Sequence, residues 1–307
     1  MGYLFLFISA ISGTIKGFFG KKISDNINGL EGAIFTNFIR MIFCIPIGLV
    51  FVFFDGNFSD LAVSREVLLI SLFAGISTSI FIVSWLLAVK KSAFTSLDAF
   101  ISLGIIVPIL LSNIFYEEKV SLSQFIGIIL LLGGVFIMSL YNNQIKQKIG
   151  LPSLILFLIV GLANGFVDFS YKIFQHTKAD TPASVFNFYI YIFSAVTLLT
   201  VFMFLHFTHQ REAVPDSGER EVESLIDKKK TIYIAIMAIF LFCNSYFKTL
   251  AASLLTSVQM YPLAQGASIL FALLMSSIFL KEKIKPLCIA GLTILFISLL
   301  FINVIVF

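Results

Sequence analysis

The stretch Phe115–Leu140, FYEEKVSLSQFIGIILLLGGVFIMSL, joins a short charged segment to a long apolar run. A second stretch of the same kind is Phe279–Val304, FLKEKIKPLCIAGLTILFISLLFINV. An offset of 164 residues superimposes the two and aligns Phe115 with Phe279, Glu118 with Glu282, Lys119 with Lys283, Gly127 with Gly291 and Leu131 with Leu295. Long apolar runs precede both Glu-Lys segments as well as follow them. The sequence therefore predicts a duplicated membrane protein.

The composition supports this prediction. Of the 307 residues, 59% are hydrophobic and 12% are charged, and the mean hydropathy is +1.01. A soluble domain carries about 25% charged residues, so this chain has too few to cover a surface that faces water. The net charge of +4 is spread over short connections and indicates neither a nucleic acid nor an acidic partner. The N-terminus shows no signal-peptide pattern, so we expect the first helix to be retained.

Ten apolar runs are long enough to span a bilayer, which needs about 20 mostly apolar residues. Their length and their lack of alternation exclude membrane-spanning strands. The connection at about 208–230 is long and highly charged, and we predict no site in it. The predicted spans are 3–19, 33–54, 67–89, 93–116, 122–141, 151–173, 183–207, 231–249, 253–280 and 285–306.

The ten predicted helices divide into two repeats of five, residues 1–145 and 146–307. Because each repeat then crosses the membrane an odd number of times, the second must enter from the opposite side. Such inverted-topology repeats build alternating-access carriers around a site near the bilayer midplane. Lys and Arg concentrate in the odd-numbered connections, which by the positive-inside rule places those connections in the cytoplasm and both termini outside.

The repeated Glu-Lys segment followed by a glycine-bearing helix resembles the EamA-type branch of the drug/metabolite transporter superfamily. As in that family, a glycine lies nine residues after each glutamate: Gly127 after Glu118, and Gly291 after Glu282. The resemblance implies a ten-helix inverted-repeat carrier of amino acids, metabolites, nucleotide sugars or drugs. It also implies that the first, third and fourth helices of each repeat line a central path. Cytoplasmic termini are implied too, which is the opposite of the charge count.

Four ionisable residues within predicted spans or at their ends are candidates for a functional site, because a charge there is costly and usually functional. They are Lys16, Asp98, Asp168 and Lys248. We expect Lys16 to approach Asp98 toward one membrane face, and Asp168 to approach Lys248 toward the other. Such pairs can act as gates, closed on one side while the other side is open. Alternatively, the lysines reach the headgroups and the acids lie in wet vestibules.

Uncharged polar side chains on the helices that the family places at the centre are further candidates for binding a solute. They are Asn164, Tyr171, Asn244, Gln259, Tyr261 and Gln265. Trp85, the single tryptophan, is interpreted either as an interfacial anchor or as part of a cavity wall. Arg40 belongs to a helix that the family makes peripheral, and we expect it to pair locally or to reach an interface.

Two prolines, Pro108 and Pro262, interrupt the fourth and ninth predicted helices. A proline frees the carbonyl one turn earlier, which can bind a solute or act as a bending point, and a purely structural kink is the alternative. Pro262 follows Tyr261 and precedes Gln265, which favours a site in that segment.

Glu118 and Glu282 recur in both repeats, which favours a structural role over transport. That role is to hold the hairpin or to cap the following helix near its positive end. The glycines Gly127, Gly133 and Gly134 are expected to permit close packing of helices, since membrane interfaces select small residues.

Together these features predict a secondary active transporter of a small organic solute, coupled to protons or to exchange, in the plasma membrane of a bacterium. No phosphate-binding GxxxxGK[ST] loop is present, so ATP hydrolysis is not expected. A membrane enzyme is the weaker alternative, because the three histidines His176, His206 and His209 lack metal-ligand spacing. A non-transporting scaffold stays open. We predict no cofactor, no metal and no nucleic-acid partner, and leave open whether the chain forms a homodimer.

Overall fold

A computed structural model describes residues 1–91, 97, 101–140, 151–177, 180–210, 228–279 and 286–303 of the chain. All regular secondary structure in these ranges is helical. The helices are α1 (Gly2–Ser24), α2 (Gly29–Asp55), the short 3-10 helix η1 (Phe58–Leu61), α3 (Arg65–Lys91), α5 (Ile106–Tyr116), α6 (Leu122–Leu140), α7 (Leu151–Thr177), α8 (Ala183–Gln210), α10 (Lys228–Ala252), α11 (Ser257–Phe279) and α12 (Pro286–Asn303).

Seven of the described helices are long and apolar enough to cross a membrane: α1, α2, α3, α7, α8, α10 and α11. Three further apolar helices are shorter, at Ile101–Tyr116, Leu122–Gly134 and Ile289–Ile302. Every predicted span therefore overlaps an apolar helix in the described residues. The number of full membrane crossings stays a prediction, because three of these helices fall below spanning length there.

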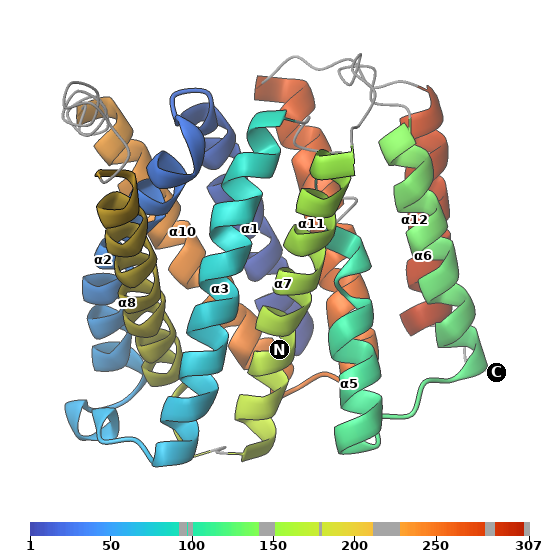
Figure 1. The fold of residues 1–307 in the computed structure, drawn as a ribbon. Helices are drawn as coiled ribbons and strands as arrows, with labels where there is room; N and C mark the ends of the chain where they lie inside the picture. The colour runs from blue at the N-terminus through green and yellow to red at the C-terminus, as the bar shows by residue number, and fades with distance from the viewer. Residues whose placement is uncertain are drawn as a thin grey trace.

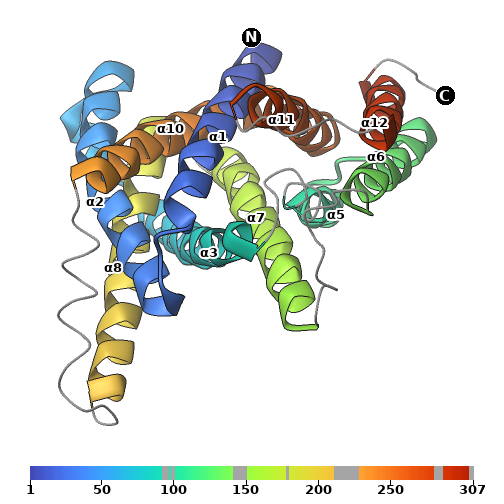
Figure 2. The same ribbon diagram turned by 90° about the horizontal axis from the view of Figure 1, so that it is seen from above.

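The packing of the helices relates the two halves to each other. The main contacts are kept when the helices α1, α2, α3, α5 and α6 are replaced, in that order, by α7, α8, α10, α11 and α12, and the reverse. Helix α1 packs against α10 as α3 packs against α7, and α1 against α11 as α5 against α7. The pairs α2·α8 and α6·α12 map onto themselves and lie at opposite edges of the bundle (Figure 2). In Figure 1, α3 runs upward whereas its counterpart α10 runs downward. The fold is thus a two-fold arrangement of related halves.

Glycines allow α6 to lie close to α12. A Cβ added at Gly127 would lie 2.9 Å from the Ser298 carbonyl oxygen, and one at Gly134 would lie 3.0 Å from the Gly291 carbonyl oxygen. Both backbone contacts confirm the expected packing role. The same expectation for Gly133 is wrong, since a Cβ there would meet no described atom within 4 Å. Consecutive residues point in different directions around a helix, so Gly133 and Gly134 cannot face the same neighbour.

The helix that contains Pro108 is broken one turn before the proline. Residues 104–105 form a turn, and α5 begins at Ile106. Proline has no N–H to donate to the carbonyl four residues earlier, which here belongs to Gly104. A Cβ added at Gly165 would lie 2.4 Å from that oxygen. The Gly104 carbonyl oxygen is not free, because it accepts from the Val107 N–H at 3.1 Å and lies against Gly165 of α7. Pro108 therefore marks a structural break and leaves no free carbonyl at Gly104 for a solute. Pro262, in contrast, lies inside the continuous helix α11.

The Glu-Lys connection between α5 and α6 is a tight turn. Glu117 ends α5 in the left-handed conformation, with φ of 54°. The N-terminus of α6 is capped by Ser121 and Gln124: the Ser121 N–H donates to Gln124 Oε1 (2.9 Å), and the Gln124 N–H donates to Ser121 Oγ (3.3 Å). The expectation that Glu118 caps the helix following it is therefore wrong, and its carboxylate is directed elsewhere.

Candidate functional site

A polar cavity lies among the central helices. Its volume is about 70 Å³, and since one water molecule needs roughly 10–15 Å³, it has room for several waters or a small organic group. Its walls come from the first, third and fourth predicted helices of each half, as the family resemblance implied. The lining residues are Gly13, Thr14, Lys16, Gly17, Phe81, Trp85, Ile101, Asn164, Asn244, Lys248, Gln265 and Ser268.

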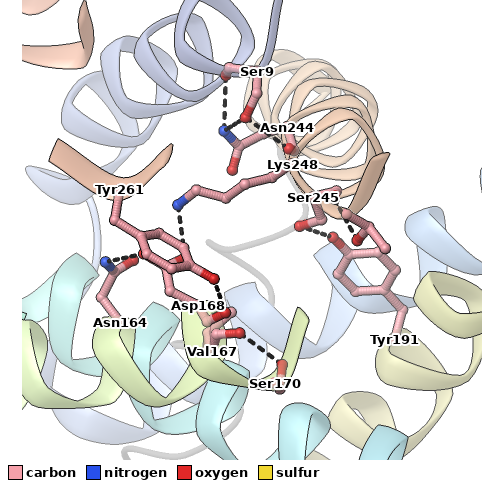
Figure 3. A network of polar contacts seen from close by, with 11 residues as sticks. Ser9, Asn164, Val167, Asp168, Ser170, Tyr191, Asn244, Ser245, Lys248 and Tyr261 are labelled. Atoms are coloured by element: carbon pink, nitrogen blue, oxygen red, sulfur yellow. Dashed lines mark hydrogen bonds and ion pairs between the residues drawn. The ribbon is translucent and has the colours of Figure 1, made fainter. Parts of the chain in front are cut away.

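A buried ion pair joins α7 to α10 beside this cavity (Figure 3). Lys248 Nζ lies 2.6 Å from Asp168 Oδ1, and the two side chains are only 14% and 4% exposed. Asn164, one turn earlier on α7, donates from Nδ2 to Asp168 Oδ2 at 3.3 Å. The structure thus confirms the predicted contact between Asp168 and Lys248. Their part in transport stays a prediction.

Helix α7 carries a second buried charge one turn beyond Asp168. Asn164, Asp168 and Lys172 are spaced four residues apart, so they lie on one face of the helix. Lys172 Nζ donates to Glu118 Oε1 at 3.0 Å and to the Leu255 carbonyl oxygen at 2.6 Å. The sequence reasoning missed Lys172 as a site residue, although its four-residue spacing from Asp168 was a usable signal.

Glu118 connects the two halves of the molecule. Its Oε1 accepts from Lys172 of α7, and its Oε2 accepts the N–H of Ser257, the first residue of α11, at 2.7 Å. A carboxylate at a helix N-terminus satisfies an N–H that lacks an intrahelical partner and interacts favourably with the helix dipole. Ser257 Oγ also shares a hydrogen bond of 2.7 Å with Ser112 Oγ of α5. Glu118 thus caps α11, a helix of the other half, and not the helix that follows it.

The surroundings of Glu118 hold it in the charged form. Burial raises its pKa, but the hydrogen bonds from Ser257 and Lys172, together with the Lys172 charge, outweigh this effect. The pKa of Glu118 therefore lies below its ordinary value of 4.5. The Glu118 carboxylate is therefore charged near neutral pH and links α7 to the N-terminus of α11.

The cavity also brings together Lys16 and Lys248, which the sequence reasoning separated to opposite membrane faces. That separation is wrong. Helices α1 and α10 cross closely where Asn244 Nδ2 donates to the Ser9 carbonyl oxygen (2.8 Å) and Ser9 Oγ donates to the Asn244 carbonyl oxygen (2.9 Å) (Figure 3). A Cβ added at Gly13 would lie 2.9 Å from Asn244 Nδ2, so glycine permits this approach. Both lysines then reach the same central space.

Of the other polar candidates, Tyr261 contacts the ion pair indirectly. Its hydroxyl donates to the Asp168 carbonyl oxygen at 2.5 Å, and the residue is fully buried (Figure 3). Gln265, one turn later on α11, lines the cavity. Tyr171 instead lies in the hydrophobic core, edge-on to Phe186, and Gln259 lies in the first turn of α11 outside the cavity lining. The polar residues flanking Pro262 therefore do gather at the site.

Aromatic side chains form one wall of the cavity. Trp85 is 7% exposed and lines the cavity, so its interpretation as an interfacial anchor is wrong. A Cβ added at Gly20 would lie 2.6 Å from the Trp85 ring, which shows that glycine makes room for the ring to pack inward. Phe81 lies beside it, with Lys16 Nζ 5.7 Å from the ring centroid. Sequence reasoning missed Phe81, and an aromatic in an apolar run gives no local signal.

Two residues singled out by the sequence, Asp98 and Glu282, lie outside the described residues, so the expected Lys16–Asp98 pair stays a prediction. Within the ranges that the structure describes, no group of three or more His, Cys, Asp or Glu side chains could hold a metal ion. Cys44 and Cys243 are both free thiols there. The contacts observed at the site are the Asp168–Lys248 ion pair and the hydrogen bonds around it.

The sequence pattern of the EamA-like transporter family matches residues 1–140 and again residues 151–304. The chain belongs to this family. The cavity of this EamA-like protein is built from residues of both matched segments. No curated protein matches the chain. Among solved structures, one described as the crystal structure of a protein superimposes with a TM-score of 0.66 at 10% identity, covering 96% of each chain. At that identity the likeness shows the fold alone.

Proposed function

We propose that this EamA-like protein is a secondary active transporter that moves a small organic solute by alternating access. The proposal rests on one observation: a buried Asp168–Lys248 ion pair borders a polar cavity built from both halves. The exchangeable packing pattern and the opposite directions of α3 and α10 support inverted-topology repeats. Ten crossings would give each half the five that such inversion requires.

The ion pair favours a zwitterionic solute, such as an amino acid. A solute that separates Asp168 from Lys248 must replace both partners, because an unpaired buried charge is strongly unfavourable. A zwitterion offers its ammonium group to Asp168 and its carboxylate to Lys248. A neutral solute can offer neither charge. Hydrogen-bonding groups of Asn164 and Gln265 in the lining would help to orient such a solute.

The Glu118 network would act as the closed gate in the state that the structure represents. It lies one further turn along α7 from Asp168 and ties the α5–α6 connection to the N-terminus of α11. Opening this end would require Glu118 to leave both Lys172 and Ser257. Access to the cavity would then switch from one side of the membrane to the other. This switch would be coupled to protons or to a counter-solute.

The test is solute exchange in proteoliposomes, with the panel chosen by a thermal-shift screen of amino acids, nucleosides, sugars and cationic drugs. We expect amino acids to raise the Tm and to exchange across the membrane. Asp168→Asn should abolish exchange, because it removes one half of the charge pair. Asp25→Asn, the same chemical change at an exposed position, should leave it intact. A well-folded Asp168→Asn protein that exchanges at the wild-type rate would refute the proposal.

A non-transporting scaffold is the second candidate. It would be favoured by a dry and fully packed bundle, whereas the cavity here is lined by charged and amide side chains. Reconstituted protein that binds solutes without moving them would support the scaffold. We place the protein in the plasma membrane of a bacterium, which fractionation of a tagged protein would test.

A further inference from the structure

Arg40 is a fully buried cation near the middle of α2. It is 2% exposed, and it lies about 17 Å from the start of the helix at 1.5 Å per residue. Its helix packs against α8 and α10, on the side of the bundle away from α6 and α12 (Figure 2). The sequence-based expectation that Arg40 reaches an interface is therefore wrong.

The guanidinium of Arg40 has unused donors. Its Nε and Nη2 have no hydrogen-bond partner, and within the described ranges of the chain it forms no ion pair. Two ionisable groups interact electrostatically with it, Cys44 of the same helix and Tyr191 of α8. The Cys44 thiol is directed at the Ala238 carbonyl oxygen (3.6 Å). The Tyr191 hydroxyl donates to Ser245 Oγ at 2.7 Å (Figure 3). Neither neighbour supplies a negative charge.

Burying an unpaired charge is energetically unfavourable, and Arg40 cannot avoid this by losing its proton, because the guanidinium of arginine stays charged in proteins. A charge at this depth in a bilayer is normally paired, and a buried polar group without a partner in the protein calls for a specific explanation, of which a bound water or ion is one. A water molecule bridging Arg40 to Asn37 Oδ1, which also lacks a partner, would satisfy hydrogen bonds but leave the charge uncompensated. An anion would satisfy both requirements.

We propose that Arg40 binds a small monovalent anion between α2, α8 and α10, either chloride or a carboxylate group of comparable size. The site lies next to the Tyr191–Ser245 hydrogen bond, and Ser245 lies one turn before Lys248 on α10. It is therefore separate from the Asp168–Lys248 pair but adjacent to it. The inference does not depend on transport activity, because it concerns the charge balance of the folded protein.

The experiment measures the Tm of the purified full chain in a neutral detergent at constant ionic strength. Sodium gluconate, whose anion is bulky, is replaced stepwise by sodium chloride or by sodium acetate. We expect a saturable rise of roughly 5 °C at one hundred times the dissociation constant. A response to chloride assigns an inorganic anion, a response to acetate assigns a carboxylate, and either supports the site.

Variants locate the response. Arg40→Met should fold without an anion requirement, because it removes the buried charge, and its Tm should be the same in all three salts. Arg40→Lys keeps the charge, so its Tm should still rise with the anion, but less than in the wild type. This variant tests the site if Arg40→Met fails to fold. Arg65→Gln removes an exposed arginine and should respond as the wild type does. Equal Tm values of the wild type in chloride, acetate and gluconate would overturn the proposal. A full response in Arg40→Met would also overturn it, by placing the anion elsewhere.

Discussion

The ion pair between Asp168 and Lys248 allows a quantitative test by a double-variant cycle. The changes are Asp168→Asn, Lys248→Met and the two combined. At 2.6 Å, two unit charges attract by about 6 kcal/mol at an effective dielectric constant of about 20. Most of this attraction is offset by the loss of hydration when both groups are buried. The informative quantity is therefore the cost of leaving one charge alone.

Removing one partner of a buried pair costs about 3–5 kcal/mol. Lys248 lines the cavity and is 14% exposed, so water can partly solvate it, and we expect Asp168→Asn to cost about 3 kcal/mol of unfolding free energy. Lys248→Met should cost a similar amount, because Asp168 is only 4% exposed. The combined variant leaves no unpaired charge and should be less destabilised than the sum of the two single variants, with a coupling energy of at least about 2 kcal/mol.

The measurement is reversible unfolding in mixed detergent micelles, followed by the loss of helical circular dichroism. Asp25→Asn serves as the control, since this carboxylate is exposed and should change the free energy by less than about 0.5 kcal/mol. A coupling energy below about 0.5 kcal/mol would show that Asp168 and Lys248 contribute independently. The argument for a zwitterionic solute would then lose its basis.

Three further predictions concern the network and the helix contacts. Because the pKa of Glu118 is lowered in the folded protein, its carboxylate stabilises the fold at pH values above 4.5, its ordinary pKa, and this stabilisation is lost as the pH falls through the lower pKa of the folded state. Glu118→Gln should therefore flatten the fall in Tm between pH 7 and pH 3. A Tm profile like that of the wild type would exclude a stabilising role for the Glu118 carboxylate. Gly127→Val should cost about 1–3 kcal/mol through its clash with the Ser298 carbonyl, whereas Gly133→Val, its matched control, should be neutral; equal costs would contradict the packing geometry. Tyr261→Phe removes the hydrogen bond to the Asp168 carbonyl and should lower stability by about 1 kcal/mol in denaturant unfolding.

The sequence by itself determined where the helices are and that they come in two related sets. Helices in a bilayer must be long and apolar, so the runs between charged connections are visible without any tertiary information. The 164-residue offset aligned Glu118 with Glu282, which pointed to a structural role for the first of these. Charges within apolar runs are rare enough to be noticed singly. That rule found Asp168 and Lys248 and predicted their contact.

Which way each helix faces was decided by the tertiary structure. In a soluble protein the polar face of a helix marks its exposed side, but lipid is as apolar as the protein core, so apolar periodicity does not separate lipid-facing from buried positions. For this reason the sequence could not tell that Trp85 packs inward or that Gly134 rather than Gly133 faces α12. It also could not tell that Arg40 is buried without a partner among the described residues.

Contacts between the two halves could likewise not be predicted from the sequence. Glu118 and Ser257 are 139 residues apart, and nothing local to either indicates that a connection of one half caps a helix of the other. The same holds for Ser9 and Asn244, whose contact brings Lys16 and Lys248 into one cavity. Local patterns fix helices because backbone hydrogen bonds form within each segment. A site between halves depends on how those helices cross, and only the folded chain settles that.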